Sequence, residues 1–157
     1  MHGKNKTICI AGKNQCAIDC LSFVIQNFKD FKILALPNKS DTGKDNWQKS
    51  FKKYALSKKV SITNLKSIYK IENLYLFSLE YEHILKIKNF KSDNLFNFHF
   101  SLLPKYRGFT PLQSDLINGD EEVRVSIIKA NAEFDKGDTA IQLGIKINYP
   151  IKIKEVI

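Results

Sequence analysis

The sequence predicts an α/β fold with a doubly wound, mostly parallel sheet. The first observation is alternation, because short apolar runs such as 6–11 and 73–79 are separated by segments with helical spacing of apolar residues. The second is that glycine or turn-forming residues follow these runs, which places loops at one edge of the sheet. The chain of 157 residues is 43% hydrophobic, so residues 1–157 are expected to form one domain with a single core.

Strand runs and helical segments alternate through the first half of the chain. The first run ends at Gly12, and the polar loop 38–45 follows the second run at the same edge. Asp45 or Asn46 can cap the second long helix, which runs to about Lys58. The predicted elements are the strands 6–11, 32–37, 60–62 and 73–79, the helices 16–28 and 46–58, and a helical turn at 64–69.

Two polar side chains stand out in the second half. Residues 94–100 alternate apolar and polar side chains, which predicts a strand with Asn97 and His99 on one face. Pro104 lacks an amide hydrogen and ends this strand, so the pair lies at its C-terminal end, where open α/β sheets bind ligands. The remaining predicted elements are helix 110–118, strand 123–130, turn 133–138 and strand 139–147.

The composition favours a cytoplasmic protein. No window is long and apolar enough for a membrane span, and the start has no signal-peptide pattern. The net charge of +9 comes almost entirely from lysines spread along the chain, so we expect no dedicated nucleic-acid surface. Three cysteines, Cys9, Cys16 and Cys20, crowd into the first strand and helix, which favours free buried thiols over disulfides or a metal site.

Two segments each allow two interpretations. The turn Gly12-Lys13-Asn14 is either a generic tight turn or a phosphate site made from amides at a helix N-terminus. Trp47 either belongs to the apolar face of the second long helix, which we favour, or stacks on a ligand.

A long ordered motif runs through the second half of the chain. It reads Asn-x-His-x-Ser-Leu-Leu-Pro-x-x-Arg-Gly at 97–108, Asn-Gly-Asp at 118–120 and Asp-x-Gly-Asp at 135–138. This motif resembles the N-terminal catalytic domain of the folate-dependent formyltransferases, clearly over about 94–140 and more loosely back to Thr7. The resemblance implies a Rossmann-like formyltransferase fold. Related domains continue further, so the chain is expected to be truncated at its C-terminus.

Formyl transfer gives three motif residues a common chemistry. The side-chain amide of Asn97 and a protonated His99 can donate hydrogen bonds to the oxyanion that forms on the formyl group. Asp135 favours the charged imidazole and can take the amine's proton directly or through one water. The resemblance therefore implies a catalytic set of Asn97, His99 and Asp135. The alternative is that the three residues only satisfy neighbouring backbone groups and form a turn.

The resemblance also implies the binding residues, largely through main-chain groups. The donor would be 10-formyltetrahydrofolate, with no metal. Its pterin is assigned to the segment after the strand 73–79 and to the downstream turn, at His83, Ile84, Leu85, Glu133, Phe134 and Gly137. The acceptor substrate is assigned to Gly12, Lys13, Asn14, Trp47 and Arg107.

We therefore predict an N-formyltransferase that moves a formyl group to the amine of a nucleotide-linked amino-deoxysugar. The stretches 100–108 and 46–50 look closer to the nucleotide-sugar branch than to other branches of the family. The alternatives are a methionyl-tRNA formyltransferase-like enzyme and a catalytically silent remnant that binds folate. The expected partner is an amino-sugar nucleotide, without membrane or nucleic acid, and a homodimer stays open.

Overall fold

The computed structural model describes residues 6–101, 122–131 and 137–146. The chain divides into two compact units, Met1–Phe96 and Asn97–Ile157. The strands belong to one mixed sheet in the order β3-β2-β1-β4-β5-β6-β7. This order, with parallel pairing among β1 to β4, confirms the predicted α/β fold with a mostly parallel sheet.

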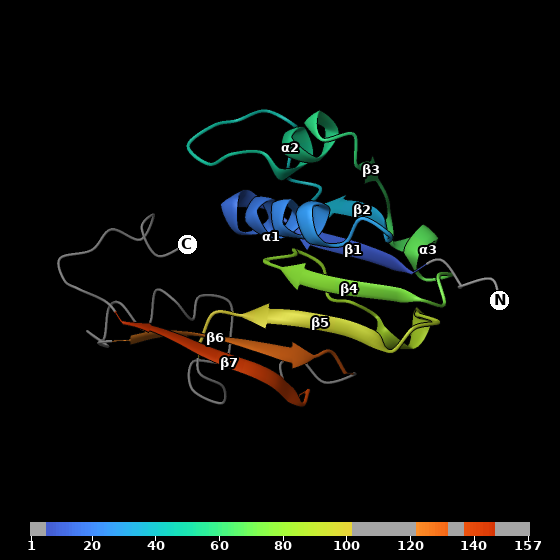
Figure 1. The fold of residues 1–157 in the computed structure, drawn as a ribbon, viewed down its shortest axis with the longest axis vertical. Coiled ribbons are helices and arrows are strands. Elements are labelled where there is room, and N and C mark those ends of the chain that lie inside the picture. Colours follow the sequence, from blue (N-terminus) through green and yellow to red (C-terminus); the bar gives the residue numbers. More distant parts are fainter. Residues whose placement is uncertain (1–5, 102–121, 132–136, 147–157) are drawn as a thin grey trace. The chain divides into compact units, whose positions relative to one another are not determined.

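The first unit is built around strand β1 (Thr7–Gly12), in which every residue is buried. β1 pairs in parallel with β2 (Lys32–Pro37) on one side and β4 (Leu74–Leu79) on the other, and β3 (Ser61–Ile62) continues from β2. Gly12 is in register with the last residues of both neighbours, so three strands end at one level, with their arrowheads toward the same edge (Figure 1). The loops at that edge hold the first group of candidate site residues.

Two helices cover the strands of the first unit. Helix α1 (Asn14–Asn27) packs on β1 and β2 and buries one face, and α2 (Phe51–Ser57) packs on α1, β2 and β3. The apolar spacing of α1 puts its buried side chains on a single stripe, as expected for a surface helix of a globular protein. The buried residues of α1 are Ala17, Ile18, Leu21 and Val24. Two short helices complete the unit, α3 (Leu65–Ile68) and the 3-10 helix η1 (Ile87–Asn89).

The second unit contains an antiparallel ribbon of β6 (Glu122–Lys129) and β7 (Thr139–Lys146). A bulge lies in the register between Ile127 and Ile128. β5 (Asn94–His99) begins in the first unit and ends in the second. Every residue of β7 is exposed, including three apolar side chains at alternate positions, whereas Ile128 of β6 is 2% exposed.

The predicted strands are all present, and their ends lie within one residue of the predicted ends. The start of the second long helix was wrong, because α2 begins at Phe51 and its N-cap is Ser50 rather than Asp45 or Asn46. The apolar-face interpretation of Trp47 was also wrong, since this side chain lies before α2 and is 87% exposed. The predicted helix 110–118 lies outside the described residues.

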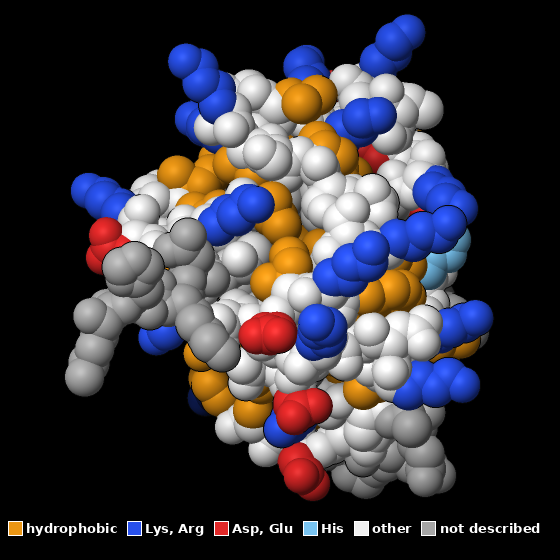
Figure 2. Space-filling view, turned by 90° about the vertical axis from the view of Figure 1, so that its right-hand side faces the viewer, with side chains coloured by type: hydrophobic (Ala, Val, Ile, Leu, Met, Phe, Trp, Pro, Cys, Tyr) orange, Lys and Arg blue, Asp and Glu red, His pale blue; other side chains and the backbone are white. Residues whose placement is uncertain are grey.

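The three cysteines are free, as predicted. Burial raises the pKa of all three thiols, to about 12 for Cys16 and about 11 for Cys20, so all three are protonated and poorly nucleophilic. No helix in the described part of the chain is long and apolar enough to cross a bilayer. Lysine and arginine side chains are spread over the face in Figure 2, with apolar side chains between them.

Candidate active site

The turn between β1 and α1 depends on a glycine at the strand end. Gly12 is buried, and a Cβ atom at this position would lie 2.1 Å from the carbonyl oxygen of Leu79, the register partner on β4. Such a distance is far below contact distance, so only glycine lets β1 and β4 approach this closely. The residue predicted as a substrate contact is therefore required first by the packing of the strand ends.

The next two residues begin helix α1. Lys13 is the N-cap with an extended backbone and no side-chain cap hydrogen bond, and Asn14 has a left-handed φ of 61°. The Asn14 side-chain amide donates to Oε2 of Glu80 at 3.1 Å. This contact places the predicted substrate turn beside the start of the predicted folate segment. A phosphate role for the turn stays a prediction.

The segment Glu80–Leu85 leaves β4 at the same edge. Glu80 has a left-handed φ of 54°, which turns the chain directly after the strand. Ile84 is 74% exposed, so this apolar side chain does not contribute to the core. His83 is half-buried, and its Nε2 atom is sealed from solvent and has no hydrogen-bond partner among the described residues. An exposed apolar side chain beside an unpartnered ring nitrogen fits a heteroaromatic ring that carries hydrogen-bonding groups.

A buried asparagine holds this segment in place. Asn38, 2% exposed, follows β2, and its backbone amide donates to the carbonyl of Gly12 at 3.1 Å. Its side chain donates through Nδ2 to the carbonyl of Glu80 at 3.0 Å and accepts through Oδ1 from the amide of Glu82 at 3.1 Å. Asn38 therefore connects the C-terminal ends of β1, β2 and β4 through its hydrogen bonds.

The Glu82 side chain in turn binds the two residues that follow Asn38. Its carboxylate accepts from the backbone amide of Lys39 through Oε1 and from the Ser40 hydroxyl through Oε2 at 2.8 Å. Oε1 also lies 3.5 Å from Nε2 of His83, an ion pair when the imidazole is protonated. We call Asn38, Lys39, Ser40, Glu80 and Glu82 the clamp. Sequence analysis missed Asn38 and Glu82 as functional candidates because they are 44 positions apart, and the only local signal was polarity after each strand.

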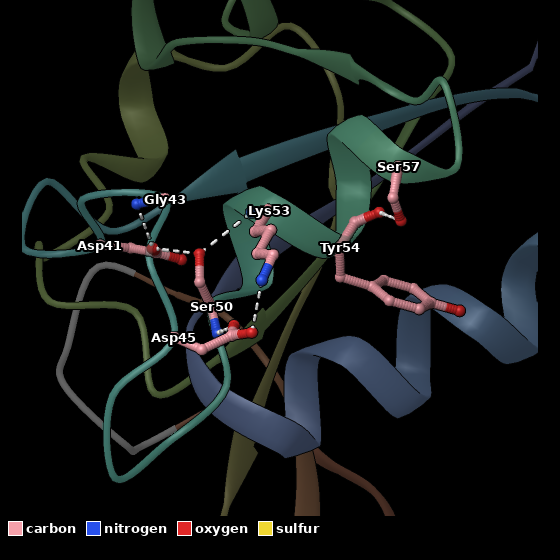
Figure 3. A network of polar contacts seen from close by, with 7 residues as sticks. All are labelled: Asp41, Gly43, Asp45, Ser50, Lys53, Tyr54 and Ser57. Atoms are coloured by element: carbon pink, nitrogen blue, oxygen red, sulfur yellow. Dashed lines mark hydrogen bonds and ion pairs between the residues drawn. The ribbon is translucent and has the colours of Figure 1, made fainter.

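Beyond the clamp, the β2–α2 loop is tied to itself (Figure 3). Oδ1 of Asp41 accepts from the Gly43 amide at 3.0 Å and from the Ser50 hydroxyl at 2.6 Å. Asp45 accepts from the Ser50 amide at 3.0 Å and pairs with Nζ of Lys53 at 2.7 Å. Two carboxylates that precede the exposed Trp47 thus bond to Ser50 and Lys53, which follow it, and fix the loop around it.

Three ionisable groups at this edge have shifted pKa values. Desolvation opposes ionisation of Glu82, but hydrogen bonds from Ser40 and from the Lys39 and Ser40 amides lower its pKa overall. A hydrogen bond from Lys53, with the Ser50 amide, lowers the pKa of Asp45. Desolvation, helped by the Glu82 charge, raises the pKa of Tyr81 to about 12. The edge is therefore held by carboxylates that stay ionised at neutral pH.

In the second unit, the end of β5 carries the predicted catalytic pair. Asn97 is half-buried and His99 is 5% exposed, and both engage in polar or ring contacts within the protein. Their i, i+2 spacing puts both side chains on one face of the strand. The strand exit is fixed by Ser126 of β6, whose buried hydroxyl donates to the carbonyl of Ser101 at 2.6 Å and accepts from Nε2 of Gln142 at 3.0 Å.

A backbone hydrogen bond joins the end of β6 to the residue before β7. The backbone amide of Lys129 donates to the carbonyl of Asp138 at 2.9 Å. A Cβ atom on Gly137 would lie 1.5 Å from the Lys129 carbonyl oxygen, so this position requires glycine. Four predicted site residues lie outside the described residues: Arg107, Glu133, Phe134 and Asp135.

Within the first unit, the structure brings together the Gly12–Asn14 turn, the Glu80–Leu85 segment and the β2–α2 loop. Trp47 has no described contact with the other predicted site residues. Among the described residues, no group of three or more His, Cys, Asp or Glu side chains is placed to hold a metal ion.

Comparison with known proteins gives this arrangement a context. The family described as formyl transferase matches residues 80–155. A solved sugar 3N-formyl transferase, WlaRD, in the presence of dTDP and 5-N-formyl-THF, is 42% identical with a TM-score of 0.83. An N-formyltransferase from Helicobacter canadensis in complex with folinic acid and dTDP-3-aminofucose is 37% identical, also with a TM-score of 0.83.

These matches cover the relatives only in part. The first structure matches over 93% of this chain and 54% of its own, and the second over 91% and 54%. A curated methionyl-tRNA formyltransferase from Lactobacillus acidophilus is 46% identical over 69 residues, which is 43% of this chain and 22% of that protein. The chain thus spans about half the length of the two solved relatives and less of the curated one.

Proposed function

Because this chain belongs to the formyl transferase family, we propose that it transfers a formyl group from 10-formyltetrahydrofolate to the amine of a nucleotide-linked amino-deoxysugar. The observation that carries the proposal is the Asn97–His99 pair at the end of β5, within a chain that is 42% identical to a sugar 3N-formyl transferase over 93% of its length. The two solved relatives also support a nucleotide sugar as the acceptor, since one was solved in the presence of dTDP and the other in complex with dTDP-3-aminofucose.

Asn97 and His99 supply hydrogen-bond donors in the proposed reaction. As the acceptor amine attacks the formyl carbon, negative charge develops on the formyl oxygen. The Asn97 amide and a protonated His99 then stabilise this charge, and one such donor is typically worth about 100- to 1000-fold in rate. Asp135, which follows β6 in the sequence, takes the proton that the amine loses.

The predicted binding residues in this proposal come from both units of the chain. The backbone around His83, Ile84 and Leu85, with that of Glu133, Phe134 and Gly137, faces the pterin of the donor. The buried Nε2 of His83, which has no hydrogen-bond partner among the described residues, and the exposed Ile84 suit a flat ring with polar edges. Gly12, Lys13, Asn14, Trp47 and Arg107 contact the nucleotide sugar, with Trp47 placed for stacking by its exposure.

The test incubates the full chain with labelled 10-formyltetrahydrofolate and a panel of amino-sugar nucleotides. We expect formyl transfer to at least one dTDP-linked amino sugar. Asn97→Ala should reduce kcat by about 100-fold or more, because it removes one oxyanion donor. Asp135→Ala should also abolish most of the rate. Retention of wild-type activity by both variants would refute the assigned residues, and absence of transfer to every sugar would refute the acceptor class.

The curated relatives favour a second candidate, a methionyl-tRNA formyltransferase-like activity. Aminoacylated initiator tRNA, offered as the acceptor, separates the two proposed activities. If the chain acts on tRNA, its affinity for tRNA must fall steeply as the salt concentration rises. A remnant without turnover would still gain thermal stability on adding folate. The cytoplasmic location and the homodimer stay predictions.

A further inference from the structure

We propose that Asn38 and Glu82 are positioning residues that hold the backbone of residues 82–85 in the conformation that binds the folate donor. This inference rests on the proposed function, because it assigns a role within the same binding surface. In this proposal neither side chain contacts the donor. Both act through the hydrogen bonds of the clamp, which fix the backbone of the segment.

Asn38 acts on the backbone on both sides of Tyr81. One side-chain atom accepts from the Glu82 amide and the other donates to the Glu80 carbonyl, so the turn after β4 is closed by a single buried side chain. Glu80 sits in a left-handed conformation that a non-glycine residue adopts at a cost of about 1 kcal/mol. The two Asn38 hydrogen bonds hold the carbonyl of this strained residue and the backbone amide two residues later, which offsets that cost.

Glu82 closes the opposite side of the clamp. Its two carboxylate oxygens accept from consecutive residues, the amide of Lys39 and the hydroxyl of Ser40. Hydrogen bonds to an ionised group are stronger than those between neutral groups, so this carboxylate is a firm attachment. Four hydrogen bonds therefore join the turn after β2 to the turn after β4, although the two are far apart in sequence.

The clamp matters most for the residues that follow it. Ile84 is 74% exposed, and Nε2 of His83 has no hydrogen-bond partner among the described residues. The described contacts of the His83 ring, an edge contact with Tyr81 and a 3.5 Å approach to Glu82, both lie within the same segment, so they do not fix the segment from outside. A binding surface built from backbone groups requires the backbone to be in place before the ligand arrives, because ordering it on binding would weaken affinity. The backbone position of residues 83–85 then depends on that of Glu82, which Asn38 holds through the Glu82 amide.

The clamp also continues into the loop that carries Trp47. The Asp41 amide donates to the Asn38 carbonyl at 3.0 Å, and Asp41 in turn anchors Ser50. The folate segment and the proposed substrate loop therefore share one set of hydrogen bonds.

Glu82 is the better target for a test, because removing the buried Asn38 side chain would leave polar backbone groups unsatisfied and endanger folding. We compare Glu82→Ala and the milder Ser40→Ala, which removes only the hydroxyl donor to this carboxylate, in the full chain. Glu72→Ala is the matched control: this glutamate precedes β4 and pairs with Lys91 between side chains about 60% exposed. For each variant we measure kcat, the KM for 10-formyltetrahydrofolate, the KM for the acceptor and the melting temperature without ligand.

We expect Glu82→Ala to raise the folate KM about tenfold and Ser40→Ala about threefold, with kcat and acceptor KM within about twofold of wild type. Glu72→Ala should match wild type. A purely structural role would lower the melting temperature and the active fraction while leaving the folate KM unchanged, and that result would overturn the inference while the proposed function stands. If the wild-type chain neither turns over nor binds 5-formyltetrahydrofolate, the proposed function falls and this role falls with it.

Discussion

The loop edge of the first unit and the β6–β7 ribbon of the second differ in how their side chains are used. At the loop edge, buried strand ends meet loops whose carboxylates and amides bond to one another, as with Asn38 at 2% exposure. In the ribbon, β7 is exposed throughout, and its apolar side chains at 141, 143 and 145 are 50–64% exposed. A buried polar side chain joins the strand ends in one region, and an exposed apolar row lines a strand in the other.

This difference shows that hydropathy alone does not locate the parts of this chain that are sensitive to substitution. Polar loop residues usually tolerate change, and apolar strand residues usually do not. Here the polar loop residues hold the strand ends together, whereas the apolar row of β7 has little buried surface to lose. Paired substitutions of one residue type in both regions test this directly.

The largest contrast is expected for leucine. Leu76 in β4 is fully buried, so Leu76→Ala should lower the free energy of unfolding by about 2–5 kcal/mol through lost burial and cavity formation. Leu143→Ala in β7, at a side chain 63% exposed, should change it by less than about 0.5 kcal/mol. Urea unfolding of the full chain measures both. Equal losses would mean that the β7 row is covered in solution.

Glycine gives the next contrast. Gly12→Ala would place a Cβ atom 2.1 Å from the backbone oxygen of Leu79, which cannot move without shifting β4, so we expect a loss of about 1–3 kcal/mol. Gly144→Ala would meet Oε1 of Glu122 at 1.8 Å, but that atom ends a flexible side chain and can swing away. We expect a change below about 1 kcal/mol there. Thermal unfolding compares the two, and a costlier Gly144→Ala would reverse the ranking of the regions.

The strands were the most predictable part of the fold. Each strand run pairs within a regular sheet, so local sequence pattern and final structure agree to within one residue. The start of α2 was not predictable in the same way. Trp47, Phe51 and Ala55 share helical spacing, but the side chains of Asp41 and Asp45 are used to fix the loop and Ser50, which leaves Ser50 as the cap.

The candidate site was predictable only where local sequence carries it. Asn97 and His99 were found because strand alternation and a motif put them together. The clamp was not found, since Asn38 and Glu82 meet only after β1 has been placed between β2 and β4. Nothing in either local sequence distinguishes a buried, fully bonded asparagine from an ordinary turn residue.

Substitutions of two serines, Ser50 and Ser57, test how much the hydrogen bonds of the loop edge contribute to stability. Ser50 accepts from the Lys53 amide as the N-cap of α2 and donates to Asp41, so Ser50→Ala should lower the free energy of unfolding by about 1 kcal/mol. Ser57→Ala removes only an exposed bond to the Tyr54 carbonyl, shown beside the network in Figure 3, and should change it by less than about 0.5 kcal/mol. Chemical denaturation resolves the difference, and equal values would show that the Asp41–Ser50 network contributes nothing beyond an ordinary surface bond.

The smallest expected effect is a pH dependence from Glu82. Hydrogen bonds outweigh desolvation and lower the pKa of this carboxyl in the folded protein, so its contribution to stability is present above the ordinary glutamate pKa of about 4.3. That contribution is lost as the pH falls through the lowered folded value. Glu82→Gln cannot titrate, so the melting temperature gap between wild type and this variant should narrow by up to about 2 °C between about pH 6 and pH 3. The same comparison can be made in a protein that carries Ser40→Ala, which removes one of the hydrogen bonds responsible. There the melting temperature gap between Glu82 and Glu82→Gln should narrow at a higher pH than it does with Ser40 present. A gap that stays constant over this range would show that the carboxylate does not hold the clamp in solution, and the loop edge would then differ from the ribbon in apolar burial alone.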